Sequence, residues 1–456
     1  MLSLSCPPVS SPWTQDRVLA LAPDSASASA GQGLASRSKW SSLGQSDRAV
    51  WGLCQGSGKS PYQTRVDLSE PAFKCSCPSR KFPCKHGIGL MLMFAKDAKA
   101  FASASEPGWV TDWLASRVER SEKKAERAEK AASGEPPSDP EAAAKRAAQR
   151  MARVSDGIAE CQVWLHDLIR RGFADAQRED TKFWDRAASR MVDAQAPGLA
   201  SSIRRLHAAT VSGEGWQVRA ADQIGRLAML LSAGIRLDSL TPEFALDVRA
   251  ALGFTQSKDE ALAQPGLADT WLVAGQIIEE EDRLRARRSW LFGEKSGRRA
   301  LVLDYAAGPA PLDPSIVAGT KFEGEVCFYP GSLGVRAIVK TKSALAPVGI
   351  PKSGAFDPSV ETFLRGFASS LAKQPWLNTW PLLLHARLAR LGDRWCVRDD
   401  AGDTLPIAPT YPAIWSLASI AADEPVWLSA EWNGEFLIPL AVLGKEFDQL
   451  FHRWAA

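Results

Sequence analysis

Four side chains that can bind a soft metal ion lie within twelve residues, CSCPSRKFPCKH, at positions 75–86. They are Cys75, Cys77, Cys84 and His86, with the spacing C-x-C-x6-C-x-H. Thiolate and imidazole are ligands that zinc prefers, and four of them complete its tetrahedron. The stretch therefore predicts one zinc ion bound by these residues; the alternatives are a disulfide with a spare thiol, or a chance cluster.

A complete set of four protein ligands leaves no position for water or substrate, so we expect a structural ion. Clustered cysteines bind metal rather than pair as disulfides where the compartment is reducing. The N-terminal stretch MLSLSCPPVSSPW lacks the basic and long apolar segments of a signal peptide. Since no apolar run approaches 18 residues, we expect a cytoplasmic protein without a membrane span.

The elements around the ligands must bend the chain sharply. Ligands one residue apart cannot both reach one ion from a regular strand, and Pro78 and Ser79 suit a tight turn. RAVWGLCQGSG and YQTRVDL predict two strands, FKCSC a further extended segment, and HGIGLMLMFAKD a helix. The N-terminus of that helix would favour thiolates. We therefore expect a small ββα-like zinc module over about residues 50–95.

Composition divides the 456 residues into regions of an α+β multidomain protein. We expect an N-terminal region with the zinc module (1–116), a charged helical linker (117–153), a helical domain (154–285) and a β-rich C-terminal domain (286–456).

Local patterns refine the two larger regions. Helices are predicted over 180–194, 198–211, 217–233, 241–252, 269–285 and 357–373. In the C-terminal region, RRALVLDYA, KFEGEVCFY and GVRAIVK predict strands, and WCVRDDAGDTLPIA a hairpin. Asn433-Gly434 in VWLSAEWNGEFLIPL is a strong turn signal and predicts a second hairpin. These strands predict a small antiparallel meander or partial barrel.

Catalytic patterns are missing from the sequence. GSGKS at 56–60 resembles the end of a phosphate-binding loop, but Leu53 stands where that loop requires glycine. The chain has no G-x-S-x-G and no H-E-x-x-H, and its other histidines are isolated. We therefore expect no enzymatic activity and no small-molecule substrate.

Positive charge gathers near the zinc ligands. The chain carries a net charge of +3, yet residues 1–100 hold 12 Lys and Arg against 6 Asp and Glu. Lys59, Arg80, Lys81 and Lys85 are candidates to contact phosphates, which would make the module a DNA-binding one. The alternative role of these charges is to balance the thiolates.

A second interpretation makes the chain a non-enzymatic protein–protein adaptor. Phe82 and Pro83, between the ligand pairs, would suit an apolar contact. The linker at 117–153 would let two bodies bind together and raise their effective concentration. The roughly 300 residues beyond the module exceed what a DNA clip needs. Both interpretations stay open from the sequence.

The ligand stretch resembles the SWIM-type zinc finger, whose signature is C-x-C-x(n)-C-x-H, at all four ligands. The flanks VLALAPDSASASAGQGLA, WGLCQGSGKSPYQTRVDL and HGIGLMLM are similar to bacterial SWIM zinc finger family proteins, as are MVDAQAPGLA and DTWLVAGQ. The resemblance implies zinc binding together with contacts to DNA or to proteins. It also implies a MoxR-type AAA+ ATPase and a von Willebrand A-domain protein as partners.

Overall fold

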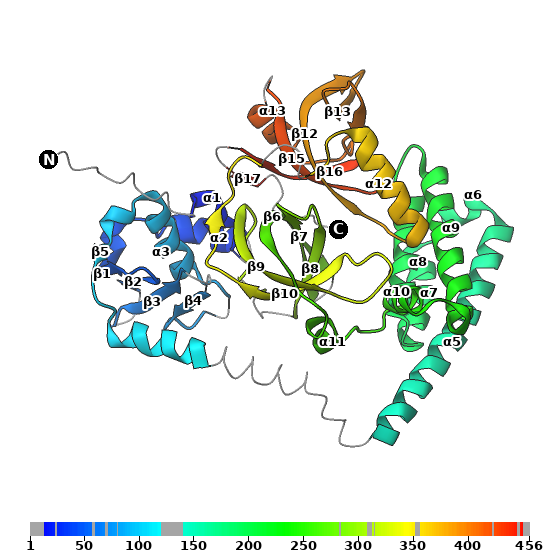
Figure 1. Cartoon of the computed structure of the whole chain (residues 1–456), viewed down its shortest axis with the longest axis horizontal. Coiled ribbons are helices and arrows are strands. Elements are labelled where there is room, and N and C mark those ends of the chain that lie inside the picture. Colours follow the sequence, from blue (N-terminus) through cyan, green and yellow to red (C-terminus); the bar gives the residue numbers. More distant parts are fainter. Residues whose placement is uncertain are drawn as a thin grey trace.

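The structure, a computed structural model, describes residues 13–449 with several gaps. The gaps are residues 23–24, 57–59, 69–71, 80, 120–139, 282–283, 308–311, 314, 352–355, 422–423 and 445–446. Figure 1 shows a small N-terminal module on the left, a β-barrel in the centre, a helical bundle on the right and a second sheet above the barrel. The predicted α+β multidomain class is thus confirmed in its broad form.

The N-terminal module is a five-stranded sheet with helices on both faces. Its strands are β1 (Trp40–Gln45), β2 (Ala49–Cys54), β3 (Tyr62–Asp67), β4 (Ala72–Cys75) and β5 (Ala102–Ser103). They follow the order β4-β3-β2-β1-β5, antiparallel except that β5 runs parallel to β1. A helix over residues 108–119 packs Val110, Trp113 and Leu114 on one face.

The other face is covered by α3 (Lys85–Lys96), the helix predicted after the ligands. Its residues 86–94 are all buried, because α1 (Gln15–Ala20) and α2 (Ser25–Gln32) pack on the side away from the sheet. A helix that is apolar all round needs such cover. The HGIGLMLMF sequence therefore forms the centre of the module, and its predicted order of strands, ligand loop and helix is confirmed.

The bundle confirms four of the predicted helices, those over 180–194, 198–211, 217–233 and 241–252. Its helices are α5 (Pro140–Arg171), α6 (Phe173–Arg178), α7 (Thr181–Asp193), α8 (Pro197–Thr210), α9 (Trp216–Ile235) and α10 (Pro242–Leu252), followed by α11 (Lys258–Leu262). Trp184, Leu199 and Leu227 lie in its core. Among the described helices, none combines the length and apolar character that crossing a membrane requires.

The linker boundary predicted between residues 153 and 154 falls inside α5. The segment EAAAKRAAQRMAR is rich in strong helix formers, so the helix starts at Pro140 and runs on into the bundle. The part of the linker at 120–139 lies outside the described residues.

The helix predicted over 269–285 is wrong, because these residues lie in strands β6 (Leu267–Glu281) and β7 (Leu284–Gly293). Consecutive residues Trp271, Leu272 and Val273 are all buried, since both faces of β6 are covered. A strand buried on both faces shows an apolar run without alternation, which periodicity cannot distinguish from a buried helix.

The central sheet closes into a five-stranded barrel. Strands β8 (Arg299–Ala307), β9 (Thr320–Phe328) and β10 (Arg336–Lys342) follow β7, with β11 (Ala346–Pro347) at the edge of β9. Strands β6, β7 and β8 form a meander, β9 pairs with β6, and β10 joins β9 antiparallel and β8 parallel. This connectivity is that of the OB-fold. Trp271, Leu291 and Phe322 fill the interior.

The C-terminal sheet has the order β14-β13-β12-β15-β16-β17. Its strands are β12 (Trp380–Leu391), β13 (Arg394–Arg398), β14 (Thr404–Pro406), β15 (Val426–Trp432), β16 (Leu437–Leu443) and β17 (Phe447–Gln449), with helices α12 (Val360–Lys373) and α13 (Ile414–Ala421). Both predicted hairpins and the predicted helix over 357–373 are confirmed, and Gly434 takes the expected positive φ of 101°.

The C-terminal sheet packs on the outside of the barrel. Trp290 and Phe292 of β7 are 2% and 1% exposed and share one apolar core with this sheet. Glu431 of β15 is fully buried at the contact, where its carboxylate accepts from Trp290 Nε1 at 2.6 Å and from Arg288 Nη2 at 3.0 Å. The outer face of β7 is therefore covered by the C-terminal sheet.

Candidate metal centre

The four predicted zinc ligands converge at one end of the N-terminal sheet. Their ligand atoms all lie within 4.8 Å of one another. His86 Nδ1 is 3.8 Å from Cys75 Sγ and 3.9 Å from Cys84 Sγ. A tetrahedral zinc ion with ordinary bond lengths would place such sulfur and nitrogen atoms about 3.6 Å apart. The donor types, and the two spacings that involve His86, therefore fit zinc.

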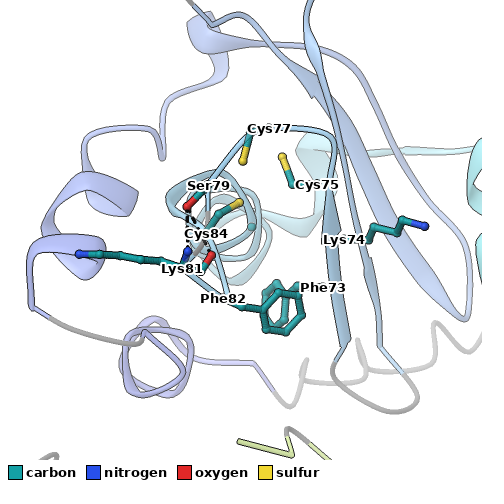
Figure 2. Close-up of a pocket in the computed structure, with 9 residues that line it drawn as sticks. Phe73, Lys74, Cys75, Cys77, Ser79, Lys81, Phe82 and Cys84 are labelled. Atoms are coloured by element: carbon teal, nitrogen blue, oxygen red, sulfur yellow. Dashed lines mark hydrogen bonds between the residues drawn. The ribbon is translucent and has the colours of Figure 1, made fainter. Parts of the chain in front are cut away.

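Local structure brings the two ligand pairs together from different elements. Cys75 is the last residue of β4, and the chain leaves the sheet directly after it so that Cys77 can turn back. Cys84 is the N-cap residue of α3, and buried His86 lies in the first turn of that helix. Figure 2 shows the sulfurs of the three cysteines facing a common space. The bend that the C-x-C spacing requires is thus present.

Backbone amides support the sulfur atoms. The N–H groups of Cys77, Ser79 and Gly87 donate to the sulfurs of Cys75, Cys77 and Cys84, respectively. Each of these hydrogen bonds favours the thiolate over the thiol. The turn after β4 and the first turn of α3 therefore supply an electrostatic environment that suits metal-bound thiolates.

Side chains of β3 and β4 complete the surroundings. Thr64 Oγ1 lies 3.3 Å from Cys75 Sγ, and the ring of Tyr62 lies 5.0 Å from that of His86. Gly87 allows α3 to approach β4, because a Cβ there would come within 2.8 Å of the Phe73 ring. These contacts fix the helix, and with it the second ligand pair, against the strand that carries the first.

The thiols differ in their affinity for protons. A hydrogen bond from the Cys84 thiol lowers the pKa of Cys75 to about 3, although burial acts in the opposite direction. The same hydrogen bond, together with burial, raises the pKa of Cys84. Burial also raises the pKa of Cys77. Zinc binding would displace the remaining protons, so metal affinity depends on pH.

The last two residues of the loop between the ligand pairs, Phe82 and Pro83, pack against the module, whereas Lys81 before them is exposed. Phe82 packs edge-on against Phe73, with ring centroids 6.3 Å apart, and Pro83 is buried. The prediction that Phe82 and Pro83 offer an apolar contact is therefore wrong. A cavity of about 110 Å³ lies between these rings and the cysteines, and it has room for an ion and a few waters but not for a larger substrate.

Two of the four candidate phosphate-binding residues are described, and both are exposed. Lys81 lies in the loop between the ligand pairs, and Lys85 is the first residue of α3. Figure 2 shows Lys81 and Lys74 pointing in opposite directions, so Lys74 does not extend the same surface. Lys59 and Arg80 lie outside the described residues.

Sequence reasoning missed one cation near the ligands. Lys39 ends the short helix η1 (Arg37–Lys39), whose last carbonyl accepts a hydrogen bond from the amide of Gln55 after β2. Burial raises the pKa of Cys54, and the charges of Lys85 and Lys39 both oppose that rise. Lys39 precedes Trp40, which pairs with Cys54, and Lys85 follows the ligand Cys84, so both lysines lie at the metal end of the module. Forty-five residues separate the two lysines in the chain, so no spacing pattern could reveal that they lie at the same end of the module.

Comparison with known families agrees with this geometry. Residues 65–95, from β3 through the ligands to α3, match the SWIM zinc finger. Residues 149–252, from within α5 to the end of α10, match the SWIM-associated four-helix bundle domain. No curated protein and no solved structure gave a match.

The fold and the ligand cluster thus define a zinc-finger protein in which a helical bundle follows the finger. Both parts match family models of the same type, so the chain contains a SWIM-type zinc finger and the helical bundle associated with it. The resemblance of the ligand stretch to the SWIM zinc finger is confirmed, and MVDAQAPGLA lies within the matched bundle. VLALAPDSASASAGQGLA and DTWLVAGQ lie beyond the matched ranges, and the latter belongs to β6.

Proposed function

We propose that the zinc module binds nucleic acid, with DNA as its ligand, through the end that carries the metal site. The supporting observation is a polarised arrangement of charge along the module. Lys39 and Lys85 are both exposed at the metal end, and exposed Lys81 lies in the ligand loop. Among the described residues, Lys39 and Lys85 form no ion pair.

Two described acidic residues of the module, Asp67 and Asp47, lie at its opposite end. Asp67 ends β3 on the side away from Cys54, where it is buried and pairs with Arg48 and Arg117. Asp47 lies in the turn between β1 and β2 at that same end. Phosphates approaching the metal end would therefore meet cations without a nearby carboxylate from these residues. Such contacts position a nucleic acid but do not read its sequence.

In this proposal the zinc ion is structural and the chain is not an enzyme. Four ligands occupy all positions of a tetrahedral ion, so the ion shapes the surface that presents Lys81 and Lys85. A reducing compartment keeps the thiols available for metal, which places the proposed function in the cytoplasm.

The central barrel does not offer the usual ligand-binding face of its fold. In OB-folds the outer face of the second and third strands binds oligonucleotides or oligosaccharides. Here the corresponding strands are β7 and β8, and Trp290 and Phe292 on that face are buried against the C-terminal sheet. The proposal therefore rests on the zinc module and not on the barrel.

The adaptor interpretation is the alternative, with a MoxR-type AAA+ ATPase and a von Willebrand A-domain protein as predicted partners. Its support from Phe82 and Pro83 is lost, since these residues pack inward. The family resemblance still motivates a test with these two partners.

Fluorescence anisotropy with labelled single- and double-stranded DNA tests the proposal on the zinc-loaded full chain. Lys39→Glu/Lys85→Glu changes the metal end. Lys96→Glu/Lys99→Glu is the matched control, because both lysines are exposed at the far end of α3. We expect the first variant to weaken binding and to lower the salt slope for duplex DNA by about 0.9 for each lost phosphate contact.

If both variants bound DNA with the wild-type affinity, the metal end would not be the contact surface. If the intact chain bound no DNA at either of two salt concentrations but captured one of the predicted protein partners, the adaptor function would replace the proposal. Zinc content is measured for each variant, so that loss of the ion is not mistaken for loss of a phosphate contact.

A further inference from the structure

An arginine without a polar partner lies on the outer face of the zinc module, the face of the sheet away from α3. Arg65 of β3 is only 7% exposed. Its guanidinium forms no hydrogen bond or ion pair with the described residues, and its Nε is buried without a partner. A buried charge is costly unless an opposite charge or hydrogen-bond acceptors compensate for it. Arg65 therefore lacks the anion that its surroundings require.

Two indoles hold the Arg65 guanidinium in place. Its central carbon lies 5.0 Å from the ring centre of Trp109 and 5.6 Å from that of Trp113. Both tryptophans belong to the helix over residues 108–119, which packs on this face. Such contacts use the face of the guanidinium and leave the N–H donors at its edge for hydrogen bonds. Of its three nitrogens only Nε is cut off from solvent, so the two terminal nitrogens can reach a ligand.

A second cation stands beside Arg65 on the same face. Lys74 of β4 is directly opposite Arg65 in the strand register, so the two side chains are neighbours. The register places Trp51, which packs with the helix over residues 108–119, on the other side of Arg65. Lys74 is exposed and forms no ion pair within the described part of the chain. Like charges in such a pair repel, and an anion bound between them would attract both.

A carboxylate on the same face is already paired with other cations. Asp67 lies two residues after Arg65 on β3, so both side chains point to the same side of the sheet. The Oδ2 atom of Asp67 accepts from Arg117 Nε at 3.1 Å and lies 3.7 Å from Arg48 Nη2. The positive charges of Arg65 and Lys74 are therefore not balanced by Asp67.

We propose that Arg65 and Lys74 bind a terminal phosphate group, that of inorganic phosphate or of a nucleotide. A phosphate monoester carries a charge of about −1.5 to −2 at pH 7, which matches two cations, whereas a carboxylate or a phosphodiester carries less. A guanidinium donates in parallel to two phosphate oxygens, and an ammonium adds a point charge. Because Arg65 is recessed, a phosphate at the end of a molecule reaches it more easily than one inside a strand.

This site is distinct from the metal end of the zinc module, and the inference does not depend on the function proposed there. Figure 2 shows Lys74 pointing away from Lys81 of the ligand loop. Neither Arg65 nor Lys74 belongs to the surface proposed for DNA. Variants at the two sites therefore separate the two proposals, because Lys39→Glu/Lys85→Glu should bind phosphate as the wild type does.

Isothermal titration calorimetry with inorganic phosphate and with adenosine monophosphate tests the proposal on the zinc-loaded full chain. Arg65→Met removes the charge but keeps an apolar side chain against the indoles, and we expect it to bind both phosphates at least roughly 10-fold more weakly. Equal affinities of the wild type for the two would identify free phosphate as a sufficient ligand, and tighter binding of adenosine monophosphate would identify a nucleotide.

A second variant tests the same pair through stability. Lys74→Glu places a carboxylate opposite Arg65, so it should abolish phosphate binding and also slow hydrogen exchange in β3 and β4. Lys96→Glu is the matched control, because it makes the same charge change at an exposed position at the far end of α3. It should keep the phosphate affinity of the wild type.

Three results would overturn the proposal. One is the absence of binding of either phosphate by the wild type. Another is a phosphate affinity that Lys74→Glu leaves unchanged, or that Lys96→Glu lowers as much. The third is binding of a phosphoserine peptide alone, which would make the site a docking point for a phosphorylated protein. Circular dichroism and zinc content are measured for each variant. Since Lys74 is exposed, its variant still decides the matter if Arg65→Met does not fold.

Discussion

Replacement of Cys84 by serine should remove the zinc ion and unfold the N-terminal module. Cys84 Sγ lies 3.9 Å from His86 Nδ1 and accepts the amide of Gly87, so its loss breaks the ligand pair that joins α3 to the site. A structural zinc ion contributes about 10–16 kcal/mol to a small module. A whole domain is stable by only about 5–15 kcal/mol. The module without its ion should therefore be unfolded.

Metal analysis and hydrogen exchange measured by mass spectrometry provide the assay. We expect Cys84→Ser to fall from one zinc per chain to a small fraction of one, and to lose exchange protection in β2, β3, β4 and α3. Helices α7 to α10 should keep their protection, because the bundle has its own core. Cys54→Ala is the control: Cys54 is buried in the same sheet but is not one of the four clustered ligands.

Two outcomes would refute this reasoning. If Cys84→Ser kept one zinc per chain, the ligand assignment would be wrong. If it lost zinc but α3 stayed as protected as in the parent, the apolar core of the module would suffice for folding and the ion would have another role.

Three further predictions concern the helical bundle and the C-terminal sheet. Gly198→Ala should cost about 1–3 kcal/mol, since an added methyl group would overlap the Ala251 carbonyl where α8 crosses α10; faster exchange confined to the bundle would show it. Glu431→Ala should lower the free energy of unfolding by on the order of 3 kcal/mol, because it leaves Arg288 and Trp290 without their buried acceptor. Glu279→Ala removes the exposed partner of the same arginine and should lower it by less than about 1 kcal/mol. Equal urea midpoints for the two variants would contradict the argument from burial. Gly434→Ala should cost about 1–2 kcal/mol because its φ of 101° suits only glycine, with exchange rising first in β15 and β16; an unchanged midpoint would show that the turn can relax.

Short-range chemistry was predictable from the sequence. The four ligands are recognisable from their residue types and spacing, and the tight C-x-C pair requires the bend that follows β4. Helices with one apolar face, such as α7 and α8, follow from periodicity and from Asp180 and Pro197 at their starts. The Asn433-Gly434 turn was equally predictable, since few dipeptides adopt the positive φ angles that such a turn requires.

Long-range pairing was not predictable from these patterns. β6 was interpreted as a helix because its burial on both faces erases alternation. Closure of the barrel depends on β10 pairing with both β8 and β9, which no local signal encodes. The placement of Lys39 and Lys85 at one end of the module, and the contact of Trp395 with Trp415, likewise arise only when separate elements pack.

The way the barrel closes also sets an order of events during synthesis. When β8 has left the ribosome, β6, β7 and β8 can form an open meander with two unpaired edges and an uncovered apolar face that includes Trp271 and Leu291. Both edges are filled only after β10 has emerged, since β9 and β10 complete the ring. At translation rates of about 5–20 residues per second, that interval lasts roughly 2–7 seconds. Throughout it the nascent chain exposes unpaired strand edges and apolar surface, the two features that make a folding intermediate prone to aggregation.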